Sequence, residues 1–262
     1  MGHAVIPGAL CGSKSLSLDG GNSGQFRHFS PGPICAEQMG TTALLDSMGR
    51  RTKNPGSELD MDADGVARNP KILQSTPAGQ SSISKNIERG SMPKVSGVIV
   101  HQTNSPNTSS VFSSYKNAGA NGAHFLIDKD GTIYQTASLH QRTNHVGRLK
   151  SRCEAESRCS PEESRLNQRW DPKGMHARES VKPAGIRYPS NEDSIGIELV
   201  GMAHPAPGKD EPVYEEATEA QNAALAWLVN QLQLEYGFPQ TEVFRHPDVS
   251  WKNVTEASTA RW

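Results

Sequence analysis

The chain has 262 residues, a formal net charge of −1 at pH 7, and only 34% hydrophobic residues. The near-zero charge gives no general electrostatic reason to expect binding to nucleic acid or to an anionic membrane. No run of residues approaches the roughly 18 apolar positions that a membrane-spanning helix needs. The 24 glycines and 17 prolines, together with so few hydrophobic residues, indicate that part of the chain is irregular.

Residues 1–90 differ in composition from the rest of the chain. They are rich in Gly, Ser, Pro and Asn, and segments such as 17–24 consist of residues typical of turns. We therefore interpret residues 1–90 as an extension with little regular structure, which wraps the following domain or docks a partner. The first ten residues lack a basic start followed by a long apolar core, so no secretory signal peptide is expected.

The chain has four cysteines, and none of them forms a C-x-x-C pair. A zinc site made of four thiolates is therefore not expected. Two interpretations remain open at this point. Four free thiols would suit a reducing compartment, whereas the disulfides Cys11–Cys35 and Cys153–Cys159 would persist only in an oxidising one.

The first elements of a compact domain follow the extension. Val95–His101 is an apolar run that predicts a buried strand, and residues 108–117 predict a short helix. Residues 122–128 and 132–135 are two β-rich runs. The Asp-Gly pair at 130–131 between them is typical of a β-hairpin.

The second half of this domain begins with a long polar insert, residues 148–193, which has no clear periodicity and is typical of a functional or disordered segment. Ile195–Val200 then predicts another buried strand. Residues 215–236 predict the longest helix, because apolar side chains recur at intervals of three and four, and Gly237 ends it. The order of elements predicts an α/β domain over residues 91–262, with a mixed central β-sheet flanked by helices.

Two of the nine histidines occupy positions typical of a cleft. His101 ends the first buried strand, and His246 follows the apolar pair Val243-Phe244. Glu256 lies ten residues after His246, while Glu198 lies in an otherwise apolar strand, where it either faces water or handles protons in a cleft. Two imidazoles and two carboxylates suit a hydrolytic zinc site, in which three side chains hold the metal and a fourth moves protons. Six other histidines are interpreted as surface or core residues: His3, His28, His124, His140, His176 and His204.

These residues resemble the zinc-dependent N-acetylmuramoyl-L-alanine amidases of type 2. That superfamily also includes phage lysozyme-type amidases and the peptidoglycan recognition proteins. Five segments carry the resemblance, in the order in which the family has them: 98–103, 122–135, 144–147, 194–199 and 246–250. The resemblance covers residues from about 92 to 262, without the insert. It implies the amidase-2 fold and hydrolysis of the amide between the lactyl group of N-acetylmuramic acid and L-Ala in peptidoglycan or muropeptides.

The resemblance also implies roles for the candidate residues. His101 and His246 would bind Zn²⁺, together with an acidic residue shortly after the second histidine. Glu256 occupies the position that an Asp has in the muropeptide-recycling branch of the family, and Asp248 is the alternative third ligand. Glu198 matches the carboxylate that acts as general base.

The chain departs from the family pattern at two positions. Ala123 stands where phage-type members carry a tyrosine, which gives Glu198 more weight as the general base. Val254 stands where amidases usually carry a lysine that stabilises the oxyanion. His145, which matches a histidine lining the substrate groove, or Lys252 and its polar neighbours could supply the missing donor.

Several biological roles are compatible with this resemblance. A non-catalytic peptidoglycan-binding module is the alternative outside the enzymes, and bound zinc would distinguish the two. Among enzymes, a phage endolysin, a muropeptide-recycling amidase and an exported antibacterial toxin remain open. The extension, the missing signal peptide and the possible disulfides favour a toxin delivered into the periplasm of target bacteria, with a cytoplasmic location as the alternative. An immunity protein is then an expected partner, with residues 148–193 as part of its docking surface.

Overall fold

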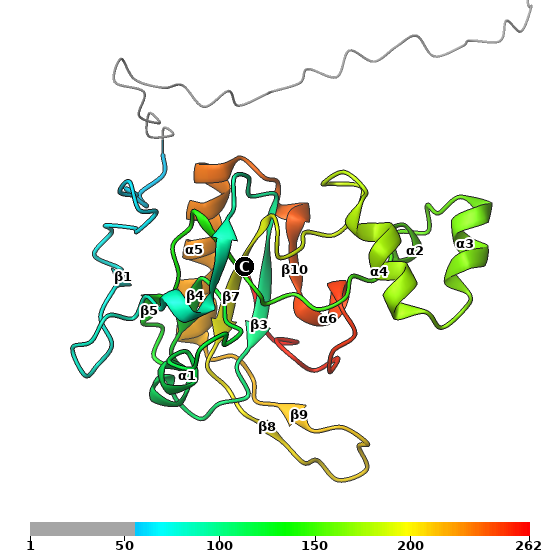
Figure 1. Ribbon diagram of the computed structural model, residues 1–262. Coiled ribbons are helices and arrows are strands. Elements are labelled where there is room, and N and C mark those ends of the chain that lie inside the picture. The colour runs from blue at the N-terminus through cyan, green and yellow to red at the C-terminus, as the bar shows by residue number, and fades with distance from the viewer. Residues whose placement is uncertain (1–55) are drawn as a thin grey trace, which may run out of the picture. The chain divides into compact units, whose positions relative to one another are not determined.

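A six-stranded mixed sheet forms the centre of the computed structural model, which describes residues 56–262 (Figure 1). The strand order is β1-β5-β4-β7-β3-β10, and neighbouring strands are parallel except for the β4–β5 hairpin. The expected mixed α/β sheet is therefore confirmed. Its strands are β1 (Ile72–Leu73), β3 (Gly97–Gln102), β4 (Phe125–Ile127), β5 (Ile133–Gln135), β7 (Ser194–Leu199) and β10 (Val243–Arg245).

Short hairpins and helices surround this sheet. Two small antiparallel sheets pair β2 (Glu88–Ser91) with β6 (Gln141–Thr143) and β8 (Ala203–His204) with β9 (Val213–Tyr214). The helices are α1 (Thr108–Ser114), α2 (Arg152–Ala155), α3 (Pro161–Asn167), α4 (Pro172–Ser180), α5 (Glu219–Tyr236) and α6 (His246–Val249), with 3₁₀ turns at Lys85–Ile87 and Gln240–Glu242. None of the helices in residues 56–262 has the length and apolar character that crossing a membrane requires.

The central strands β3 and β7 deliver side chains alternately to the two faces of the sheet. They run parallel, with His101 paired to Glu198 in register. Because successive side chains of a strand point to opposite faces, Val100 packs in the main core beneath α5, whereas Ile99 belongs to a separate cluster on the other face. His101 and Glu198 therefore share the face opposite α5, at the carboxyl ends of their strands.

Helix α5 covers the other face of the sheet (Figure 1) and has well-defined ends. The sequence predicted a start near residue 215, but the helix begins at Glu219 because the Thr218 hydroxyl accepts the N–H of Gln221 in a capping box. Gly237 ends the helix, as predicted, in the left-handed conformation with φ of 74°. The Gln221 side chain also donates to the carbonyls of Ile127 and Val200, which fixes the helix against β4 and β7.

Residues 56–90 pack against the same sheet. β1 pairs with β5 at the sheet edge, and Leu59 and Ile72 are buried in the main core. The Gln135 side chain accepts the N–H of Ala67 and donates to the carbonyl of Gly65, which ties this segment to β5. The described part of the expected extension thus lies along the domain, while the predicted Cys11–Cys35 pair lies outside the described residues.

The insert contains three short helices, α2, α3 and α4, although its residues show no periodic apolar pattern. α3 begins with a capping box between Ser160 and Glu163 and has Pro161 at its first position, and Asp171 caps α4. Such caps define helix starts even when a helix buries almost no side chain. Helix α3 was missed because it buries no residue at all, and the buried residues of α2 and α4 are too few to form a periodic apolar pattern.

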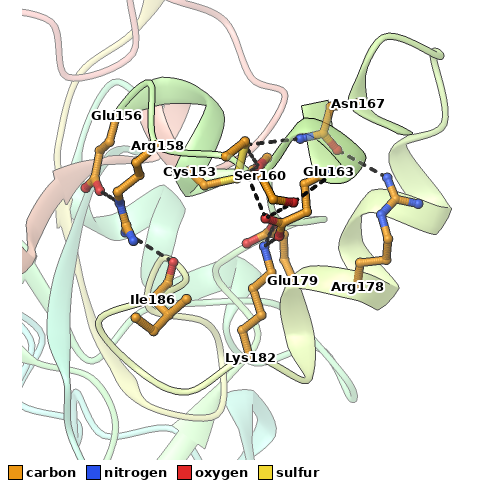
Figure 2. Close-up of a disulfide and its surroundings, with 12 residues drawn as sticks. Cys153, Glu156, Arg158, Ser160, Glu163, Asn167, Arg178, Glu179, Lys182 and Ile186 are labelled. Carbon is orange, nitrogen blue, oxygen red and sulfur yellow. Dashed lines mark hydrogen bonds and ion pairs between the residues drawn. A yellow bond between two sulfur atoms is a disulfide. The ribbon is translucent and has the colours of Figure 1, made fainter. Parts of the chain in front are cut away.

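A disulfide joins Cys153 to Cys159 within the insert, so the disulfide interpretation holds for this pair (Figure 2). Polar contacts surround it. Lys182 forms ion pairs with Glu163 at 2.8 Å and with Glu179 at 2.6 Å, which connects the end of α4 to α3. The cross-link and these contacts hold the insert helices together without a hydrophobic core of their own.

Candidate active site

A cleft of about 770 Å³ opens over the carboxyl ends of β3 and β7, on the face opposite α5. Its walls come from these strands, from α1, from the loop before the insert and from the segment after α6. All the residues that the sequence predicted for the site line this cleft: His101, His145, Glu198, His246, Lys252 and Glu256.

Three of these residues form a buried group with the composition of a metal site. His101, His246 and Glu256 each place one ligand atom within 4.8 Å of the others. Glu256 Oε1 lies 2.9 Å from Nδ1 of His246 and 3.5 Å from Nδ1 of His101. The alternative ligand Asp248 is exposed, and its carboxylate accepts the backbone N–H of Arg245 at the start of α6. The structure therefore brings Glu256, rather than Asp248, to the two histidines.

A chain of hydrogen bonds sets the tautomer of His101. The Ser194 hydroxyl donates to the carbonyl of Ser190 at 2.6 Å, so toward Nε2 of His145, 3.2 Å away, it can only accept. Nε2 of His145 also lies 3.3 Å from the Ser194 carbonyl, and we assign the ring hydrogen to this nitrogen. Nδ1 of His145 then accepts from Nε2–H of His101 at 3.0 Å. This leaves a lone pair on Nδ1 of His101, facing Glu256.

The resulting arrangement fits a cation. A lone pair of His101 and a carboxylate oxygen of Glu256 face each other at 3.5 Å, and neither of these atoms can donate a hydrogen bond to the other. Among the described residues, the buried Nε2 of His246 and Oε2 of Glu198 also have no hydrogen-bond partner. Two imidazoles and one carboxylate, with one position left open, are the donor set of catalytic zinc sites.

Electrostatics keep these groups in the forms that bind a metal. Burial lowers the pKa of His101 to about 4, with a further contribution from nearby His246, and burial lowers the pKa of His145 well below its usual value. Burial raises the pKa of Glu256, but its contacts with the two imidazoles outweigh this effect and lower that pKa to about 2. At pH 7 the group thus contains a carboxylate and a neutral His101, as metal binding requires.

Glu198 has the opposite electrostatic environment. Desolvation at the bottom of the cleft raises the pKa of this carboxyl to about 8, the charge of Glu256 adds to the rise, and Lys252 opposes it. A carboxyl group whose pKa lies near neutrality can both accept and donate a proton near pH 7. Glu198 therefore has the properties of a proton-transfer group beside the ligand cluster.

The structure distinguishes the two candidate oxyanion donors. Both ring nitrogens of His145 are engaged by His101 and Ser194. Lys252 lines the cleft, and its ammonium forms no hydrogen bond or ion pair with any residue in the range 56–262. Val254, at the family's lysine position, is 76% exposed. Lys252 thus has free N–H groups in the cleft, whereas His145 has none.

Two further residues position the cleft loop, and the sequence analysis missed both. Asn191 Oδ1 accepts the backbone N–H groups of His145 and Val146 at 2.9 and 2.7 Å. Gly196 lies beneath the His145 ring, and a Cβ there would come within 2.8 Å of it. A glycine inside a buried strand does signal such a close approach, so Gly196 could have been found. The hydrogen bond between Asn191 and the backbone of His145 joins residues that are 46 positions apart. No pattern in the sequence near Asn191 indicates it.

Tyr115, the residue that follows α1, also lines the cleft, and its sequence position within the predicted helix gave no sign of this. Its hydroxyl accepts the backbone N–H of Ala123 at 3.3 Å. Burial, followed by the charge of Glu198, raises the pKa of Tyr115, so the phenol is neutral. A tyrosine at the end of α1 thus reaches the cleft wall beside Ala123, the position where phage-type amidases carry theirs.

Comparison with known proteins decides the family. A family model described as N-acetylmuramoyl-L-alanine amidase matches residues 91–259, which is more than half of the chain. The chain belongs to the N-acetylmuramoyl-L-alanine amidase family. No curated protein sequence matches it. The family assignment confirms the resemblance, and with it the amidase activity, that the five sequence segments indicated.

Solved structures of amidases are similar to this chain at low sequence identity. The endolysin amidase LysCS from Clostridium intestinale URNW is 20% identical over 70% of this chain and 85% of its own, with a TM-score of 0.36. A selenomethionine derivative of AmpD is 18% identical over 74% and 89%, with a TM-score of 0.41. AmpDh3 from Pseudomonas aeruginosa is 20% identical over 64% and 57%, with a TM-score of 0.39.

Proposed function

We propose that this amidase is zinc-dependent and hydrolyses the amide between the lactyl group of N-acetylmuramic acid and the L-Ala of the stem peptide. The observation that carries the proposal is the convergence of a buried three-ligand group and an unpaired carboxyl in one cleft. Family membership supports the amide as the bond that is cut. Zinc is supported by the donor set and by the facing acceptor atoms of His101 and Glu256.

His101, His246 and Glu256 would hold the zinc. When bound, zinc would polarise the scissile carbonyl, make a water molecule more acidic and offset the charge that Glu256 places near Glu198. His145 acts here as a positioning residue, because its hydrogen bond keeps the lone pair of His101 directed at Glu256.

Glu198 moves the proton of the reaction. As water attacks the carbonyl carbon, a carboxylate oxygen of Glu198 accepts one proton from it, and the same oxygen then gives that proton to the leaving L-Ala nitrogen. The carboxyl is suited to both steps because nothing among the described residues hydrogen-bonds its buried Oε2. Lys252 donates to the oxyanion that forms on the carbonyl oxygen, in place of the lysine missing at Val254.

The test measures zinc content and the release of stem peptides from purified sacculi. Wild type should bind about one zinc per chain. Glu256→Ala should lose both zinc and peptide release. Glu198→Gln should keep its zinc but release peptides roughly 10²- to 10⁴-fold more slowly, because only proton transfer is removed. His145→Ala should bind zinc roughly tenfold to a hundredfold more weakly.

The control is His140→Ala, which removes an exposed histidine outside the cleft and should change neither measurement. Zinc in the wild type without peptide release would support the alternative of a peptidoglycan-binding module. Absence of zinc from the wild type would contradict the metal site.

We also propose that the protein is an exported antibacterial toxin that acts in the periplasm of target bacteria. The Cys153–Cys159 disulfide supports this location, because structural disulfides persist in oxidising compartments.

To test the toxin role, wild type and Glu198→Gln are directed to the periplasm or retained in the cytoplasm of a Gram-negative host. Growth should stop only with the periplasmic wild type, and an immunity protein that binds the chain should restore it. Lysis by the cytoplasmic form would favour the endolysin alternative, and growth in every case would contradict the toxin role.

A further inference from the structure

A second hollow, of about 420 Å³, lies on the insert and is separate from the residues of the proposed chemistry. Its walls come from α2, from the connection between α3 and α4, and from the chain at and just after α6. The residues that matter for its properties are Lys150, Glu154, Gln168, Arg169, Trp170 and Trp251.

Two indole rings dominate this hollow. Trp170 is 79% exposed, and its ring lies 5.8 Å from that of Trp251, with the two planes at 78°. A tryptophan this exposed contributes little to the stability of the fold. Large apolar side chains that remain exposed in a hollow are typical of binding sites. The flat face of Trp170 is therefore available to a ligand.

Three polar side chains of the hollow are also available to a ligand. Within residues 56–262, the side chains of Glu154, Gln168 and Arg169 form no hydrogen bond or ion pair. The charges are mixed, because Lys150 and Arg169 lie in the same hollow as Glu154 and Asp248. Neither a polyanion nor a polycation is favoured by such a surface. It suits a ligand with an apolar face and many uncharged hydroxyl and amide groups.

The hollow and the cleft are lined by neighbouring parts of the same two chain segments. A β-bridge between Leu149 and Ser250 joins these segments. Trp251 lines the hollow, and Lys252, the next residue, lines the cleft. A long ligand that leaves the cleft over these segments would reach the indole rings.

The helices on either side of Trp170 are connected by contacts drawn in Figure 2. Trp170 lies between α3 and α4, where Arg178 of α4 donates to Asn167 Oδ1 of α3 at 3.3 Å. The Asn167 amide in turn approaches the Sγ of Cys159 at 3.8 Å, which connects α3 to the disulfide. A backbone segment whose two ends are fixed before binding loses less entropy when a ligand docks.

We propose that this hollow binds the glycan strand of peptidoglycan, with an N-acetylated sugar ring stacked on Trp170. The proposal rests on the proposed function, because the amide to be cut joins the stem peptide to a sugar, so the strand must run past the cleft. The C–H face of a sugar ring packs on an indole, and its hydroxyl and acetamido groups hydrogen-bond to side chains such as Gln168 and Glu154. The enzyme then favours polymeric sacculi over short soluble muropeptides.

The test separates glycan binding from catalysis. Binding of peptide-free glycan strands is measured for wild type and Trp170→Ala, alongside hydrolysis of soluble N-acetylmuramoyl-dipeptide. Trp170→Ala should bind the strands roughly threefold to tenfold more weakly, as expected for the loss of one aromatic stacking contact. Hydrolysis of the dipeptide substrate should be unchanged, because it is too short to reach the hollow. Trp170→Tyr should retain most of the binding.

Val181→Ala is the matched control, because Val181 is an 84% exposed apolar residue of the insert that does not line the hollow. Its affinity for glycan should equal that of wild type. Equal affinity of Trp170→Ala and wild type, or no binding of glycan by wild type, would overturn the proposal; the latter is expected if the hollow instead receives a protein inhibitor. Since binding needs no turnover, a failure of amidase activity alone would contradict the proposed function and leave this result intact.

Discussion

In the cleft, His101 and Glu198 extend from buried strands and His246 directly follows a third strand, whereas in the insert Trp170 lies on the connection between two short helices. His101 and Glu198 are placed opposite each other by the register of β3 and β7, two strands inside the sheet. The insert has no such support, and its helices are connected by caps, by ion pairs such as Lys182–Glu163 and by one disulfide. The two regions thus obtain their order from different interactions.

This difference matches what each region has to do. Proton transfer and metal binding tolerate errors of only a few tenths of an ångström, and a packed sheet gives that precision. Stacking of a sugar ring on Trp170 tolerates sliding and tilting. A surface segment with polar contacts is therefore sufficient for the second task. We therefore expect the sheet to position the residues that carry out hydrolysis. We expect the insert to determine whether polymeric peptidoglycan is preferred over soluble muropeptides.

The largest predicted change in stability is a loss at low pH, to which the buried histidine His124, beside the cleft, contributes. His124 accepts the N–H of Gly196 through Nδ1 at 3.0 Å and donates through Nε2 to the carbonyl of Gln141 at 2.8 Å. Burial lowers the pKa of His124 from 6.5 to about 4. Between these values the unfolded chain binds a proton that the folded chain does not. Stability should therefore fall as the pH decreases from 6.5 to 4, by up to about 3 kcal/mol from this residue.

Urea unfolding of chelator-treated protein at several pH values checks this expectation. His124→Gln should reduce the loss of unfolding free energy between pH 6.5 and 4, because glutamine does not titrate. The loss due to His101 and His145, whose pKa values are also lowered by burial, should remain. His140→Gln, at an exposed position, serves as the control and should leave the slope unchanged. An identical slope in wild type and His124→Gln would show that the buried imidazole is not responsible.

Much of the cleft could be predicted from the sequence, because its main features are local. Apolar runs indicated β3 and β7, an Asp-Gly pair indicated the hairpin, and His101 is visible as a polar residue at the end of a buried strand. The metal group could be anticipated from these strand ends together with the family resemblance. The hydrogen bonds of His145 could not be predicted, because they are made with Ser194 and Asn191, which lie more than 40 residues away in the chain.

The insert was less predictable for a related reason. Its helices are polar and short, so their evidence lies in caps such as Ser160 and Asp171 rather than in a repeating apolar pattern. The two-residue strand β1 is equally hard to predict, because its identity depends on β5 as a partner. The pairing of Cys153 with Cys159 was one of two open alternatives, since sequence alone does not fix the oxidation state.

The smallest predicted change in stability comes from removing the disulfide of the insert, and this change distinguishes the cleft from the insert most directly. Replacing Cys153 and Cys159 by alanine opens a loop with a sequence separation of 6, which should lower the free energy of unfolding by at most about 2 kcal/mol. Affinity for glycan strands should fall, because the disulfide helps to hold the helices on either side of Trp170. Hydrolysis of soluble N-acetylmuramoyl-dipeptide should stay close to wild type, since His101 and Glu198 are positioned by the sheet.

Wild type treated with a phosphine reductant, which brings no thiolate that could bind zinc, is the comparison, because it loses the cross-link without a substitution at Cys153 or Cys159. It should reproduce the behaviour of the double variant in both assays. If dipeptide hydrolysis instead falls as far as glycan affinity, the cleft depends on the insert for its geometry. The chain segments joined by the Leu149–Ser250 bridge would then be the route of that dependence, and the division between a catalytic sheet and a substrate-selecting insert would be wrong.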